Sequence, residues 1–302
     1  MDNITVLLVI TAIFLVIVTI WWVRRRGHLR GNQVESAHAA IAACSTLLEL
    51  IAHIQQHRGM STAWLAGDKS FEQRLLGKRR EIEPLIAKLQ QVAAAENAHS
   101  YPCFTPNDIT LWRHRWGLLV NELGSHTVEK SIATHSNLIA MLLNWLGALG
   151  EARIELPLAG LLSAGVVRNF SHRLPQLSET LGQARATGSG VAAQGTCSAV
   201  ARVRLMFLVS RAESLIDQAC AVDNKGALAA QKVKALALTI RTHLLSSQKV
   251  GVSAEAYFAE STQAIDAVFQ WVREGGEALE EEISNAADGR KQQDGLRLQG
   301  SK

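Results

Sequence analysis

Several side chains in this chain carry chemistry that an active site could use. His53 and His57 stand four residues apart, the spacing at which two helical imidazoles can face one metal ion. The sequence offers no evident third ligand beside them, so we expect no metal site. Ser61 and Ser189 have no neighbouring base that could activate them as nucleophiles. We therefore expect no catalytic residues and no cofactor, and we predict that the protein is not an enzyme.

Two arginines, Arg58 and Arg185, are better candidates, and the chemistry they suit is anion binding. Residues 54–67 read IQQHRGMSTAWLAG and residues 181–195 read LGQARATGSGVAAQG, an echo that aligns Gln56 with Gln183, Arg58 with Arg185 and Ser61 with Gly188. Neither arginine has an acidic residue three or four positions away, so an inward-facing pair would lack a local carboxylate. A guanidinium presents a planar fork that fits two oxygens of a planar anion. The alternative is that both arginines lie on solvated helix faces.

The elements that position these residues are long helices. Apolar residues recur at helical spacing, Ala and Leu dominate, and only five prolines interrupt the chain. In the first helix the expected inward residues are Ala40, Ile41, Cys44, Leu47, Leu48, Ile51 and Ile54. We predict helices over about 34–66, 70–97, 109–149 with a break at 124–125, 157–194, 198–222, 227–247 and 253–284. Trp112 and Trp116 are expected in the core. No strand is predicted, and the fold class is all-α, with the helices packed as bundles.

The first 23 residues predict a membrane anchor. Residues 4–23 carry no charge and would span roughly 30 Å as a helix, the thickness of the hydrocarbon core. Trp21 and Trp22 suit the interface, and Arg24–Arg26 mark the cytoplasmic side. A cleaved signal peptide would carry its positive charge before the apolar run, not after it. We expect a single-pass protein of the inner (cytoplasmic) membrane with its N-terminus outside.

This anchor sets the expected domain order. Residues 1–3 form a short external N-terminus, 4–23 the transmembrane helix, 24–33 a basic juxtamembrane hinge, 34–284 the cytoplasmic helical domain and 285–302 a disordered tail. Of the net charge of +4, residues 1–31 supply +3, so the basic pI reflects the membrane flank and we expect no nucleic-acid partner. Four well-separated cysteines indicate free thiols in a reducing compartment.

Three segments resemble the nitrate- and nitrite-sensing (NIT) domain family. Residues 50–67, LIAHIQQHRGMSTAWLAG, are similar to that family's Q-x-E-R-G-x-S motif and are followed by FEQRLLGKRR at 71–80. Residues 181–190 give the second match, and residues 256–268, AYFAESTQAIDAV, resemble its closing helix. The matches bracket residues 40–284. His57 departs from the pattern, because the family usually has Glu there.

The resemblance implies a fold, a ligand and a site. The fold would be two packed four-helix bundles sharing long helices, with nitrate or nitrite bound between helices by an arginine from each half, here Arg58 and Arg185. The residues expected to line the pocket are Gln55, Ser61, Gly182, Gly188 and Ser189. We expect a membrane-anchored cytoplasmic sensor that signals to a separate downstream protein, and we leave a homodimer open. The alternative is a ligand-free, membrane-tethered helical adaptor.

Overall fold

The computed structural model describes the backbone of residues 3–245 and 250–299 and the side chains of residues 34–245 and 250–286. Within those ranges the chain is all-α, as predicted. The principal helices are α1 (Asn3–Leu65), α2 (Phe71–Glu96), α3 (Pro106–Glu122), α4 (Val128–Leu149), α5 (Ala164–Arg168), α6 (Leu174–Gln194), α7 (Ala199–Cys220), α8 (Ala227–Thr239) and α9 (Ala254–Gln299). Most begin and end within a few residues of the predicted boundaries.

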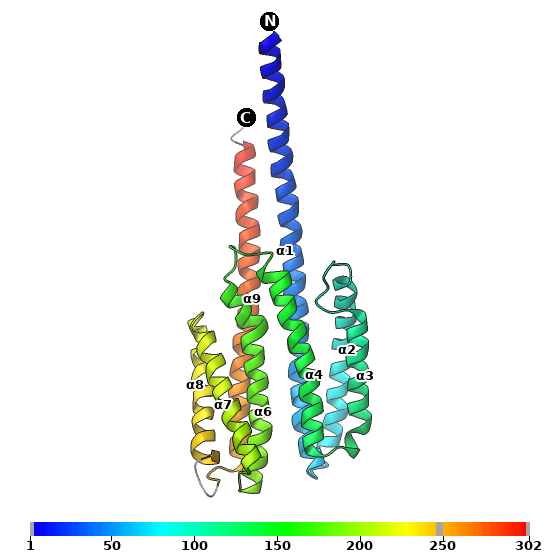
Figure 1. Cartoon of the computed structure of the whole chain (residues 1–302), viewed down its shortest axis with the longest axis vertical. Helices are drawn as coiled ribbons and strands as arrows, with labels where there is room; N and C mark the ends of the chain where they lie inside the picture. Colours follow the sequence, from blue (N-terminus) through cyan, green and yellow to red (C-terminus); the bar gives the residue numbers. More distant parts are fainter. Residues whose placement is uncertain (1–2, 246–249, 300–302) are drawn as a thin grey trace.

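The helices form two four-helix bundles packed side by side (Figure 1). In the first bundle, α1 packs against α2 and α4, and α3 closes the far side. In the second, α6 packs against α7 and α9, and α8 closes it in the same way. The bundles meet where α1 contacts α6 and α9 and where α4 contacts α6. The predicted packing of helices into two four-helix bundles is confirmed. Within the described residues each bundle has four helices of its own, so the expected sharing of long helices is not seen.

Apolar periodicity explains the first bundle. All seven inward residues expected in the first helix are buried, from Ala40 to Ile54. Trp112 and Trp116 of α3 are buried too, and Trp112 Nε1 donates to the Leu138 carbonyl of α4 at 3.1 Å. The start of α3 is fixed by a capping box, in which Thr105 and Asp108 each satisfy the other's backbone N–H.

The structure differs from the prediction at three places. Helix α1 runs unbroken through residues 24–33, where we expected a hinge, and α9 continues to Gln299 through most of the tail that we expected to be disordered. The stretch predicted as one helix from Pro157 begins instead with a non-helical corner over 156–163, and the helix that follows contains a wide π-type turn over Asn169–Arg173 between α5 and α6. A second π-type turn, over Gly150–Glu155, precedes the corner. Periodicity does not mark these changes of helical pitch.

The membrane prediction concerns residues whose side chains lie outside the described ranges. Among the described residues, Val34–Leu65 and Val128–Glu155 are long and apolar enough to cross a membrane, yet both helices pack within the first bundle. Core helices of a folded domain meet the same criteria. The span at 4–23 stays a prediction. Figure 1 shows α1 and α9 extending beyond the bundles at the same end of the molecule.

Candidate anion-binding site

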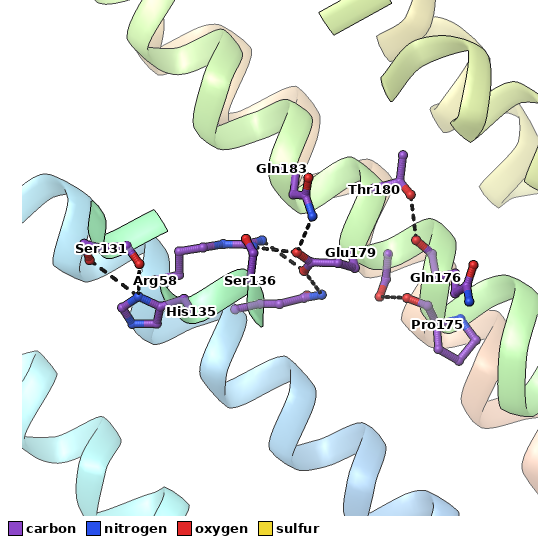
Figure 2. Close-up of polar contacts among 11 residues, drawn as sticks. Arg58, Ser131, His135, Ser136, Pro175, Gln176, Glu179, Thr180 and Gln183 are labelled. Carbon is purple, nitrogen blue, oxygen red and sulfur yellow. Dashed lines mark hydrogen bonds and ion pairs between the residues drawn. The ribbon is translucent and has the colours of Figure 1, made fainter. Parts of the chain in front are cut away.

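Arg58 lies where α1 faces the second bundle, and its side chain is buried. It forms a two-point ion pair with Glu179 of α6: Nη1 donates to Oε1 at 2.6 Å and Nη2 to Oε2 at 3.1 Å. Nη1 also donates to Ser136 Oγ of α4 at 2.8 Å. Figure 2 shows Arg58 reaching Glu179 beside Ser136. The arginine does point inward, and a carboxylate from the other bundle neutralises it.

Glu179 stands at the centre of a ring of donors. Gln55 Nε2 of α1 donates to Oε2 at 3.0 Å, and Gln183 Nε2 of α6 donates to Oε1 at 2.9 Å. With the Arg58 fork, nitrogens from both bundles converge on one planar oxyanion. Gln55, predicted to line the pocket, therefore lies at this cluster. Gln56, which the sequence echo aligned with Gln183, is exposed instead.

Arg185 approaches the same interface from α6. Its Nη1 donates to Thr262 Oγ1 of α9 at 2.9 Å, and its guanidinium carbon lies 4.9 Å from the centre of the Phe258 ring. A Cβ built on Gly59 of α1 would lie 4.0 Å from Arg185 Nη2, so Arg185 reaches the residue after Arg58. Burial, followed by the positive charge of Arg58, lowers the pKa of Arg185 to about 10. Arg185 is therefore still charged at neutral pH.

The cluster carries an unbalanced charge. Two arginines and one carboxylate sum to +1, and Glu179 pairs with Arg58 only. Within the described residues, no carboxylate lies within ion-pair distance of Arg185, although exposed Asp266 and then Glu179 attract it from further away. Because an unpaired charge that is half-buried has lost part of its hydration, a monoanion at this interface would be stabilised.

Gly182 provides the space for Arg58. A Cβ built on Gly182 would lie 2.6 Å from Arg58 Nη2 and 3.8 Å from Glu179 Oε2. The guanidinium therefore lies directly against the backbone of α6, which only a glycine permits without a shift. Gly182, which we expected to line the pocket, therefore lies in the arginine cluster; its role in ligand binding stays a prediction.

His57 and Ser61 belong to a neighbouring series of buried hydrogen bonds in the first bundle. His135 Nδ1 lies 2.7 Å from the Ser131 carbonyl and must donate to it, so its Nε2 accepts from His57 Nδ1 at 2.8 Å. Ser61 Oγ lies 3.2 Å from the same His57 nitrogen. Burial, then neighbouring positive charge, lowers the pKa of His57 to about 2, so the imidazole is neutral. Ser61 therefore packs against His57 rather than lining the arginine cluster.

Gly188 and Ser189 do not join the cluster either. A Cβ on Gly188 would lie 2.3 Å from Tyr257 Cζ, so the space that we expected to be open for a ligand is filled by this ring. Tyr257 donates its hydroxyl to the Ala184 carbonyl at 2.8 Å. Ser189 Oγ is buried without a hydrogen-bond partner. The sequence could not show that an aromatic ring from α9 covers this part of α6.

The remaining candidates lie elsewhere. His53 is 3.1 Å from Glu81 of α2 and does not share a site with His57, and the described residues contain no group of three that could hold a metal. An open groove of about 300 Å³ lies between α3 and α4, lined by residues that include Arg115, His126 and Lys130. That groove contains neither Arg58 nor Arg185. Arg58 and Glu179 are buried, whereas Arg185 is half-buried.

The family model for nitrate and nitrite sensing matches residues 49–284, most of the chain. A solved structure, that of the NasR transcription antiterminator, is similar over 93% of this chain and 77% of that one, with a TM-score of 0.67 and 20% identity, which supports the fold. A comparison with curated protein sequences gives no significant match. The motif around Arg58 and the two-bundle fold agree with that family match, and the chain belongs to the nitrate- and nitrite-sensing (NIT) domain family.

Proposed function

We propose that this protein is a membrane-anchored sensor that binds nitrate or nitrite between its two bundles, at Arg58 and Arg185, and signals to a separate protein. The observation that carries the proposal is the convergence of one arginine from each bundle on the α1–α6 interface, with a net charge of +1. Nitrate and nitrite are planar monoanions, which match both the charge and the fork geometry of a guanidinium.

The anchor gives the sensor a direct mechanical connection to the bilayer. Arg58 and the expected span at 4–23 lie on one continuous helix, α1. At 1.5 Å per residue, about 50 Å of helix separates Arg58 from residue 23. A shift of α1 at the anion site would therefore be transmitted along a rigid rod. Helix α9, which contacts Arg185 through Thr262, extends beyond the bundles at the same end as α1 (Figure 1). It could therefore also transmit a change at the site to a partner protein.

Anion-dependent stabilisation of the full chain in detergent tests the proposal. Unfolding would be followed by tryptophan fluorescence with nitrate, nitrite or chloride at matched ionic strength. A ligand at ~100 times its Kd adds about 2.7 kcal/mol to the unfolding free energy. We expect nitrate or nitrite to stabilise the wild type more than chloride does, and Arg58→Ala and Arg185→Gln to remove the difference. Arg153→Ala, which breaks another ion pair of the first bundle, should keep it.

A ligand-free adaptor is the second candidate, and one observation favours it. Arg58 is enclosed and already paired, so the interface resembles a finished core rather than an open pocket. Equal responses to all three anions in the wild type and in the two arginine variants would support the adaptor and end the sensor proposal. The antiterminator's role in transcription belongs to that protein. For this chain, the lack of a nucleic-acid partner stays a prediction.

A further inference from the structure

We propose that Glu179 is an internal competitor for the anion: its carboxylate holds the place on Arg58 that nitrate or nitrite takes, and the ligand binds by displacing it. This inference rests on the proposed function and concerns the same site. It explains how an enclosed arginine can serve as a receptor, and it gives the ligand a defined contact to break between the bundles.

The geometry of Arg58 leaves little room for an anion beside Glu179. The two terminal nitrogens are both engaged by the carboxylate, at 2.6 and 3.1 Å, and Nη1 also donates to Ser136. The Nη2 side lies against Gly182, where an added Cβ would be only 2.6 Å away. A planar anion that uses the terminal fork must therefore replace the carboxylate.

The surroundings of Glu179 also suit a planar oxyanion other than a carboxylate. A carboxylate and a nitrate are both flat and present neighbouring oxygens that accept hydrogen bonds in their plane. Gln55 and Gln183 complete the donor set at 3.0 and 2.9 Å. The carboxylate thus occupies a ready-made receptor, with donors contributed by α1 and by α6.

Charge favours the exchange. With Glu179 on Arg58, Arg185 is left without an ion pair among the described residues, and burial, followed by the positive charge of Arg58, disfavours its charged form. A nitrate is not tethered to α6 and is free to lie between the two arginines, whereas Glu179 pairs with Arg58 and attracts Arg185 only from further away. The ligand therefore offers the interface an interaction that the tethered carboxylate does not provide.

Displacement couples binding to the contact between bundles. The bonds from Arg58 and Gln55 of α1 to Glu179 of α6 join the two bundles. Removing the carboxylate from that ring releases these bonds together. A ligand shifts such an equilibrium only by its differential affinity for the two arrangements, and the loss or retention of these bonds supplies that difference.

The test compares Glu179→Gln with the wild type by calorimetric titration of nitrate, nitrite and chloride into the full-length protein in detergent. If the carboxylate holds Arg58 in about nine molecules of ten, removing it lowers the apparent Kd for nitrate roughly tenfold. Glu179→Asp keeps the negative charge but has a shorter side chain. It therefore distinguishes direct contact of the carboxylate with the Arg58 guanidinium from the electrostatic effect of a negative charge nearby. It also serves if the Gln variant fails to fold. Glu96→Gln is the matched control, because Glu96 pairs in two-point fashion with Arg153 away from the site.

The outcomes separate the two proposals. Tighter nitrate or nitrite binding by the Glu179 variants, with chloride and Glu96→Gln unchanged, supports the competitor. If the wild type binds nitrate or nitrite and the Glu179 variants bind it equally or more weakly, the competitor proposal is overturned while the sensor function stands. An equal gain for chloride also overturns it, because the carboxylate would then act only through the field. No specific response to nitrate or nitrite in the wild type or any variant removes the proposed function itself.

Discussion

Replacing Gly182 by Ala tests whether Arg58 depends on close contact with α6. The added Cβ would lie 2.6 Å from Arg58 Nη2, about 1 Å closer than an ordinary contact, and the guanidinium is held in place by Glu179 and Ser136. Either the ion pair or the spacing of α1 and α6 must give way. Overpacking of this kind costs about 1–3 kcal/mol.

Gly190 is the matched control on the same helix, because it is exposed and a Cβ there meets no atom within 4 Å. Both substitutions gain roughly 1 kcal/mol of helix propensity, so the difference between them isolates the clash. We expect Gly182→Ala to be about 1–3 kcal/mol less stable than Gly190→Ala, measured by urea unfolding, and to lose the nitrate response. Equal stability of the two variants would refute the close packing of Arg58 against α6.

Three further outcomes follow from contacts elsewhere. Burial alone would raise the pKa of Glu96, but hydrogen bonds from Arg153 and the Cys103 backbone outweigh it and lower that pKa, so the stabilising effect of Glu96 should be lost as pH falls below about 4. Arg153→Ala should lower the free energy of unfolding by about 2 kcal/mol at pH 7 and make it less dependent on pH at acid pH, measured by urea unfolding. Burial lowers the pKa of His57 to about 2, so its contribution to stability is complete above pH 6.5 and falls by up to about 1.4 kcal/mol per pH unit below that. Between pH 7 and 5, the free energy of unfolding of His57→Gln should therefore fall less steeply than that of the wild type. Thr105→Ala removes the capping box of α3 and should cost about 1 kcal/mol in thermal unfolding, whereas Thr110→Ala, an exposed site on the same helix, should cost less.

The helices were predictable because their burial is periodic. The inward face of α1 was read directly from residues such as Ile41, Leu47 and Ile54, and each is buried. The corner between α4 and α6 was not predictable, since π-type turns keep the composition of a helix while changing its direction. The continuity of α1 across residues 24–33 was also missed, because Gly27 and Gly31 suggested a break that the helix does not make.

The candidate site was only half predictable. Local reasoning found Arg58 and Arg185 but searched for their counterions within four residues, whereas Glu179 is 121 positions from Arg58 in the sequence. One signal was present: between Leu174 and Gln194, Glu179 and Arg185 are the only charged residues of an otherwise uncharged helix. Isolated charges on a largely apolar helix must find partners on other elements. The filling of the space at Gly188 by Tyr257 had no comparable signal.

The position that Glu179 takes after the anion displaces it determines how anion binding could move α6 against α1. Once an anion takes the place of the carboxylate on Arg58 and Gln55, Glu179 is left without a cation, and a buried charge without a cation is strongly disfavoured. Arg185 cannot rescue it within a rigid α6, because six residues separate the two by roughly 9 Å along the axis and place them on different faces. We expect Glu179 then to move toward solvent or toward another cation, with α6 rotating or sliding against α1 as it does so. Since α1 is one continuous helix, such a rearrangement would reach the expected membrane segment without any intermediate hinge.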